Sequence, residues 1–209
     1  MNVFEDFCPQ DGDTALLVTG ADYQHHTEIR EARYHLADGV VVIESSRLVR
    51  SGTHLRLGNV FEGALTYSDA GRITSDLSFP SRGYVEQPFR SEDGLFYTQD
   101  SEIWLNGLPF IGRFDGYDEV CHPTVHERWV YFEAKRVDPA FPGSAQGWQV
   151  LRRHLDEGVT ELVLAHGANP YVHGGLLFHS RWNAAKVAFE TAAVPLPGAA
   201  PAVALRGAA

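Results

Sequence analysis

The sequence predicts an all-β protein built from repeated antiparallel meanders. In the stretch 101–136, polar–apolar alternation, turn residues and a dense apolar run succeed one another as strand, turn, strand, turn and strand. The same order returns after an insertion at 137–147, and earlier copies occupy 86–98, 7–19 and, more weakly, 59–68. The apolar runs lie about 40 residues apart, a period typical of a β-propeller. We therefore expect a single small propeller of five blades.

Turn signals divide the chain into its expected strands, taken in order. Residues 15–21 form one strand, and 28–36 pairs with 40–45 around Asp38-Gly39. Residues 48–57 form another strand with a bend at Ser51-Gly52, and 65–67 pairs with 72–79 around a turn at 69–71. The repeat favours a strand over a short helix in 148–157, and 186–190 is the outer strand of the last blade. The propeller thus covers residues 1–193, and the Pro- and Ala-rich residues 194–209 form a flexible tail.

The region 86–181 resembles the repeats of TolB-type, WD-like β-propellers. The family pattern contains Ser-x-Ile-Trp, then His-Pro before a turn, then an apolar run that ends in a basic residue. This chain has Ser101-Glu102-Ile103-Trp104, His122-Pro123-Thr124 and a run from Val130 to Arg136. The Ser-Pro-Asp-Gly turn of the family is replaced by 125–128 and, in the next copy, by 172–175. The resemblance implies the propeller fold, but such propellers serve binding, gating and catalysis alike.

The composition argues against nucleic acid and membranes as binding partners. The 209 residues carry 17 Lys and Arg against 27 Asp and Glu, a formal net charge of −10. An acidic protein is not expected to bind nucleic acid or anionic membranes. No apolar run is long enough to span a bilayer, and residues 1–11 lack the apolar core of a signal peptide, so we expect a cytoplasmic protein. The two cysteines, Cys8 and Cys121, do not make a disulfide framework.

Propeller geometry predicts where a site lies. The start of each innermost strand and the end of each second strand share one face around the axis, where binding groups gather on loops. The residues expected there from the first group are Cys8, Asn59, Glu86, Gln87, His122 and Asn169. From the second group they include Asp100, Lys135, Arg136, Arg181 and Trp182, of which Trp182 is the best candidate for stacking on a ligand.

His122 is the strongest candidate for a catalytic or metal-binding residue. A neutral imidazole serves as a general base or as a ligand for a divalent metal. It serves equally well as a hydrogen-bonding group for the turn of its own blade. No HxH or HExxH pattern accompanies it, so no cofactor is assured. Cys121 precedes His122, but neighbours on a strand point to opposite faces, which argues against a nucleophile pair.

Arg136 and Arg181 occupy matched positions in consecutive repeats. With Lys135 they predict a cationic corner that would hold a carboxylate or phosphate. The alternative is that these cations form ion pairs with Asp100, Asp118 or Glu119.

Three functions follow from these patterns. The first is a binding propeller that holds a small polar or anionic ligand, or a partner's peptide, in an axial pocket. The second is a lyase, hydrolase or cyclase in which His122 is the base or metal ligand and Arg136 and Arg181 hold the substrate. The third is a glycoside hydrolase of the five-bladed kind using Glu86 with Asp6, but the third acid expected in that class is missing. We expect the binding propeller.

Overall fold

The computed structural model describes residues 4–22, 26–74, 84–114, 117–136 and 147–198. These residues form eighteen strands joined by turns, with no α-helix among them. No described part of the chain makes a helix of the length and apolarity needed to cross a membrane. The all-β prediction is therefore confirmed, and its basis is the short alternating segments punctuated by Gly and Asp turns.

The strands form four hydrogen-bonded sheets, each built from meanders of antiparallel neighbours. The first meander holds β1 (Phe4–Pro9), β2 (Thr14–Asp22), β3 (His26–Ala37) and β4 (Val40–Gly52). The second holds β5 (Arg56–Phe61), β6 (Ala64–Asp69) and β7 (Arg72–Thr74). The third holds β8 (Val85–Ser91), β9 (Gly94–Gln99), β10 (Glu102–Leu105) and β11 (Leu108–Ile111).

Two further meanders complete the chain. One holds β12 (Tyr117–His126), β13 (Trp129–Arg136), β14 (Trp148–His154) and β15 (Thr160–Leu164). The last holds β16 (Ala168–His173), β17 (Leu176–Asn183) and β18 (Ala188–Pro195). Strand β18 pairs with β4 at Ala192 and Val40, which joins the first and last meanders into one seven-stranded sheet.

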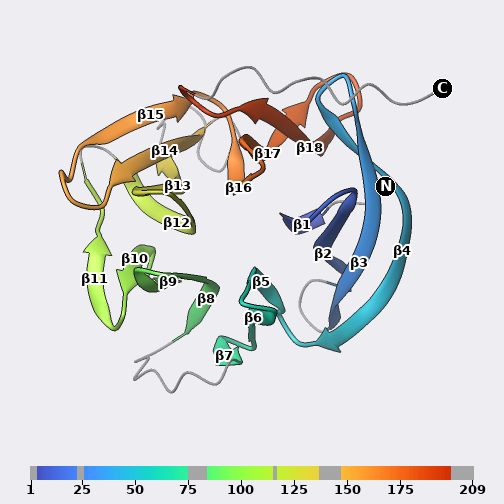
Figure 1. The fold of residues 1–209 in the computed structure, drawn as a ribbon, viewed down its shortest axis with the longest axis horizontal. Coiled ribbons are helices and arrows are strands. Elements are labelled where there is room, and N and C mark those ends of the chain that lie inside the picture. The colour runs from blue at the N-terminus through green and yellow to red at the C-terminus, as the bar shows by residue number, and fades with distance from the viewer. Residues whose placement is uncertain (1–3, 23–25, 75–83, 115–116, 137–146, 199–209) are drawn as a thin grey trace.

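The meanders stand side by side around a common centre (Figure 1). The first strand of each meander, β1, β5, β8, β12 or β16, lies nearest the middle, and the later strands lie farther out (Figure 1). Because the chain returns to its start, the last meander packs against the first. The inner strands therefore surround the centre of the ring from all sides (Figure 1).

Most predicted strands appear where the turn signals placed them. Strand β2 covers 15–21, β3 pairs with β4 around Asp38-Gly39, and β14 is a strand rather than a helix. The strand predicted at 48–57 with a bend at Ser51-Gly52 is two strands: β4 ends at Gly52 and β5 begins at Arg56, and between them Asp69 accepts a hydrogen bond from the Thr53 backbone at 2.9 Å. Strand β18 begins at Ala188 and runs to Pro195, two residues past the expected end of the domain. Residues 75–79 and 199–209 lie outside the described residues.

The apolar core is divided among the interfaces between neighbouring meanders. Five buried clusters are found among the described residues, one at each interface around the ring. Alternate residues of one strand belong to different clusters: in β13, Val130 and Phe132 pack toward β8–β11, and Tyr131 packs toward β16–β18. The second strand of a meander is thus buried on both faces, which explains its unbroken apolar run.

Each inner strand contains a β-bulge at a corresponding place. The register slips between Phe4 and Asp6, Leu57 and Val60, Glu86 and Phe89, Cys121 and Thr124, and Ala168 and Tyr171. At three of these bulges a residue with positive φ precedes a proline: Gln87 (49°), His122 (54°) and Asn169 (49°). A bulge redirects side chains and ends the regular ladder. Here the bulges occur where the inner strands approach the centre.

The bulge of β5 requires glycine at position 58. A Cβ atom there would lie 1.5 Å from the Pro88 carbonyl oxygen of β8. We predict that Gly58→Ala lowers the free energy of unfolding by at least about 2 kcal/mol, because backbone must move to relieve the overlap. Urea denaturation measures this loss. Gly112→Ala is the control, since its nearest neighbour is a side-chain oxygen of Glu102 at 3.4 Å. Equal stability of the two variants would contradict the prediction.

Candidate functional site

Two cavities meet at the centre of the ring, and both are lined by His122 and Gln87. The first, here called the axial cavity, has a volume of about 30 Å³. Its lining comes from all five inner strands: Asp6, Phe7, Cys8, Leu57, Gly58, Gln87, Phe89, His122, Pro123, Asn169, Pro170 and Tyr171. The second, the rim pocket, has a volume of about 420 Å³. It is lined by Arg56, Tyr84, Glu86, Gln87, Thr98, Gln99, Asp100, Ser101, Glu119, Cys121, His122, Glu133 and Trp148.

The hydrogen bonds of Gln87 indicate which ring nitrogen of His122 carries the proton. The backbone N–H of His122 donates to Gln87 Oε1 at 3.2 Å, and the Thr98 hydroxyl donates to the same oxygen at 2.9 Å. The other amide atom, Nε2, is therefore the one that lies 2.5 Å from His122 Nε2. Since the amide can only donate there, His122 Nε2 accepts and the ring proton is on Nδ1.

Arg56 and Asp6 complete the surroundings of His122 Nε2. Arg56 Nη2 lies 2.9 Å from it and Asp6 Oδ1 lies 3.6 Å from it. Asp6 Oδ2 also accepts the Leu57 N–H at 2.8 Å. Burial alone would raise the pKa of Asp6, but the charge of Arg56 and the hydrogen bond from Leu57 are among the interactions that lower that pKa below its ordinary value. The carboxylate is therefore ionised at neutral pH and balances the guanidinium.

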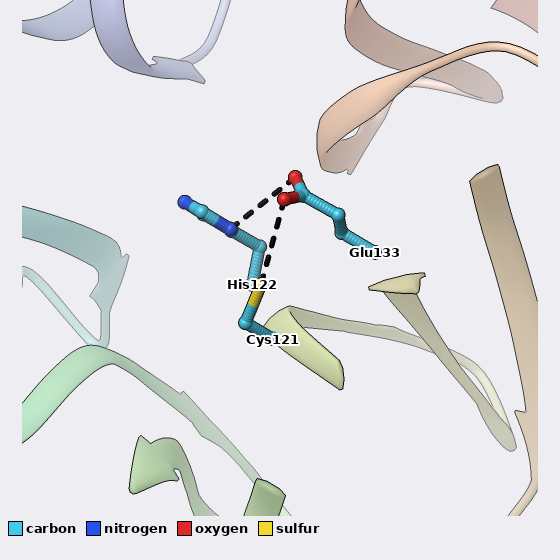
Figure 2. A group of neighbouring side chains, drawn as sticks. All are labelled: Cys121, His122 and Glu133. Carbon is cyan, nitrogen blue, oxygen red and sulfur yellow. Dashed lines mark hydrogen bonds and ion pairs between the residues drawn. The ribbon is translucent and has the colours of Figure 1, made fainter. Parts of the chain in front are cut away.

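On its other side, His122 faces a buried acid and a buried thiol (Figure 2). His122 Nδ1 lies 3.3 Å from Glu133 Oε2, and Cys121 Sγ lies 3.5 Å from Glu133 Oε1. Although Nδ1 is within ion-pair distance, it is buried and makes no well-aligned hydrogen bond. Burial, followed by the charges of Glu133 and Glu119, raises the pKa of the Cys121 thiol well above its usual range. One ligand-type atom from each of the three residues lies within 4.8 Å of the other two.

Local backbone geometry brings Cys121 and His122 to the same side. The sequence predicted that these neighbours would diverge, as they do on a regular strand. The bulge between Cys121 and Thr124, with positive φ at His122, breaks that alternation. Glu133 is the cross-strand partner of Cys121 on β13. The expectation of divergence is therefore corrected by the bulge.

Several of the predicted site residues do converge. Glu86, Gln87, Asp100 and His122 line the rim pocket, and Asn169 lines the axial cavity. The Asn169 backbone N–H donates to Glu133 Oε2 at 2.5 Å, which ties β16 to β13. Asp6, the suggested partner of Glu86, lines the axial cavity, and Glu86 lines the rim pocket.

The other predicted site residues make contacts elsewhere. The Asn59 amide bonds the backbone N–H and C=O of Arg90, at 2.9 and 2.8 Å, and so clamps β5 to β8. Lys135 lies over the Trp148 ring and 4.0 Å from Glu119, and Arg136 lies over the Tyr117 ring. Arg181 donates to Glu190 of β18 at 3.0 Å, and Trp182, 45% exposed, packs edge-on against Phe189. None of these five is among the residues that line the two cavities.

Three contributors to the site are not singled out by the sequence patterns, and a fourth lies two residues from its predicted position. Arg56, Thr98 and Glu133 stand in or next to apolar runs that read as plain strand, although an acid at position 133 inside such a run is itself a signal. In the first meander, the register slip falls directly before Asp6, and Cys8 lies two residues beyond it, paired with Leu16. Asp6 therefore takes the place that the sequence predicts for Cys8.

A scan against models of known protein families and a search of curated protein sequences each find no match. The TolB-type resemblance accordingly stays a prediction that rests on the residues of this chain.

We predict that Asp6→Asn destabilises the protein by about 3 kcal/mol, because it removes the countercharge of a buried guanidinium. Chemical denaturation at neutral pH measures the change. Asp11→Asn, in the exposed β1–β2 turn, is the matched control and should change stability by less than about 0.5 kcal/mol. A loss below 1 kcal/mol for Asp6→Asn would mean that the charge pair contributes little.

The ion pair of Arg181 predicts a pH dependence. Hydrogen bonds from Asn183, Lys186 and Arg181 lower the pKa of Glu190 from 4.5 to about 2. Because the folded pKa is the lower one, the stabilisation is complete above about pH 4.5 and is lost as the pH falls toward 2. Glu190→Gln should therefore be less stable than the wild type at pH 7, and the difference should close near pH 2. Urea midpoints across this range test it; a constant difference would refute it.

Proposed function

We propose that the chain is a five-bladed β-propeller whose axial face binds a small polar ligand. Support for five blades comes from five meanders, five apolar clusters at their interfaces and a bulge at a corresponding place in each inner strand. On this interpretation β4 and β18 are the outer strands of the first and last blades, and their single pairing closes the ring.

The observation that carries the binding proposal is the rim pocket. At about 420 Å³ it is large enough for a small metabolite. Its polar side chains come from three meanders and are fixed by packing and by the bonds around His122. A rigid scaffold that converges polar groups on one cavity is suited to recognition.

The charges of the rim pocket favour a ligand that carries a positive group. Four carboxylates line it, Glu86, Asp100, Glu119 and Glu133, against the guanidinium of Arg56. Lys135 offsets part of this charge at Glu119, at 4.0 Å, and an excess of negative charge remains. The anionic ligand expected from the sequence depended on Arg136 and Arg181, which lie against Tyr117 and Glu190 instead. An amine or guanidinium ligand fits this pocket better.

An enzyme of the lyase, hydrolase or cyclase type is the second candidate. The observation in its favour is the Glu133 carboxylate beside Nδ1, which would orient His122 as a base. Against it, Nε2 already accepts from Gln87 and Arg56, so a substrate would have to displace both donors. The glycoside-hydrolase alternative has less support, because Asp6 is buried and held by Leu57 and Arg56.

We predict that cationic compounds bind and matched anions do not. Spermidine and arginine amide should raise the melting temperature and give saturable heats in calorimetry, whereas citrate and inorganic phosphate should not. Glu86→Gln and Asp100→Asn should each weaken the binding by about fivefold, the contribution of one partly exposed charge pair. Native mass spectrometry of the purified protein would then search for a retained amine.

Glu157→Gln, on the exposed β14–β15 turn, is the control for total charge and should leave the affinity unchanged. Stabilisation by the anions alone would overturn the charge argument and restore the cationic corner. Stabilisation by neither class, with no retained molecule, would argue against a small-molecule site.

A further inference from the structure

We propose that Cys121, His122 and Glu133 form a binding site for a divalent transition metal such as zinc. The three side chains come from the bulge of β12 and the facing position of β13, and their donor atoms point toward one another (Figure 2). The site lies at the junction of the rim pocket and the axis. This proposal stands on its own geometry and does not depend on the organic ligand proposed above.

The separations of the donor atoms allow the three side chains to reach one ion. Zinc–ligand bonds of about 2.0–2.3 Å at tetrahedral angles place neighbouring ligand atoms about 3.4–3.6 Å apart. Glu133 lies at this range from both partners, with 3.3 Å from His122 Nδ1 to Oε2 and 3.5 Å from Cys121 Sγ to Oε1. These contacts use different oxygens of the carboxylate, and one donor atom from each residue lies within 4.8 Å of the other two, so rotations of the side chains would bring all three to one ion.

The polar atoms of the cluster are costly to bury without a partner. The side chains of His122 and Glu133 are only 12% and 4% exposed. Nδ1 of His122 is buried without a well-aligned hydrogen bond although it faces the acid. Cys121 Sγ donates to Glu133 Oε1 and the Asn169 N–H donates to Oε2, so Nδ1 is the atom of the cluster that a bound cation would newly satisfy.

Neighbouring groups are placed to support the ligands. Asn169 donates its backbone N–H to Glu133 Oε2, which fixes the carboxylate. Asp6 Oδ1 lies 3.6 Å from His122 Nε2, on the far side of the ring from the proposed metal. A carboxylate that receives the second ring N–H is the common support of metal-binding histidines. Both partners come from other inner strands, so the ring as a whole orients the site.

Metal binding at Nδ1 requires the ring proton to move to Nε2. The N–H at Nε2 would then donate either to Asp6 or, once the Gln87 amide has turned over, to Gln87 Oε1. Thr98 Oγ1 lies 3.2 Å from the His122 N–H and keeps that group bonded when the amide turns. Arg56 must turn away from Nε2 and keeps its charge partner Asp6 nearby.

The donor set selects the class of metal. Binding would release the Cys121 proton to solvent and leave a thiolate. One thiolate, one imidazole and one carboxylate favour zinc, cobalt or another late first-row ion over magnesium or calcium, which take oxygen ligands. Three protein ligands leave a fourth position on a tetrahedral ion. Because all three residues line the rim pocket, that position would be open to water or to a ligand in the pocket.

Cobalt titration of chelator-treated protein tests the site directly. We expect one Co²⁺ per chain, with thiolate-to-cobalt charge-transfer absorption and the visible bands of tetrahedral coordination. Zn²⁺ should displace it, and a thousandfold excess of Mg²⁺ or Ca²⁺ should not. Cys121→Ser should abolish the charge-transfer band, and Glu133→Gln should weaken binding by at least tenfold.

Cys8→Ser is the matched control, because Cys8 is the other buried free cysteine and lies outside the cluster. It should retain the cobalt spectrum. Circular dichroism of each variant separates loss of the metal from loss of the fold, and Glu133→Gln provides a near-isosteric test if Cys121→Ser proves unstable. Absence of the charge-transfer band in folded wild type, or its persistence in Cys121→Ser, would overturn the proposal. Neither result involves an amine ligand, so this test is separate from that of the proposed function.

Discussion

The polar network around His122 is the interaction on which the arrangement of the ring depends. Asp6 bonds Leu57 and so links β1 to β5, Arg56 and Gln87 link β5 and β8 to β12, and Glu133 bonds the backbone of Asn169 in β16. Every inner strand takes part. Charges buried at this depth are stable only when each has a partner, so the network fixes the inner strands relative to one another more specifically than apolar packing could.

The network in turn depends on the bulges of the inner strands. A regular strand would send alternate side chains to opposite faces and into the apolar clusters. The bulge interrupts this alternation, and positive φ at Gln87, His122 and Asn169 turns polar side chains toward the centre. Each such residue costs about 1–3 kcal/mol of backbone strain. Strain repeated at one depth in successive strands is typical of a functional centre, and the rim pocket and the Cys121–His122–Glu133 cluster both lie there.

Both proposals involve the binding of a cation, an organic amine in the rim pocket and a divalent metal in the Cys121–His122–Glu133 cluster. The pocket carries four carboxylates on a protein with a formal net charge of −10, and the cluster at its base offers sulfur, nitrogen and oxygen donors. A metal in the cluster would use Glu133 and leave Glu86, Asp100 and Glu119 for an organic ligand. The two occupants are therefore compatible, and the metal's fourth position would face the second occupant.

The sequence alone determined most strands and turns, because these depend on local patterns: alternation within strands, and Gly and Asp at turns. It also predicted that Glu86, Gln87, Asp100 and His122 would share one face, and these four residues line the rim pocket. Only the tertiary structure decided which groups meet. Arg56, Glu133 and Asp6 come from three different strands. Arg181 on β17 lies opposite Glu190 on β18, a pairing that the sequence patterns did not predict. Register and bulge position depend on contacts distant in sequence, and they set the partners of every charge at the axis.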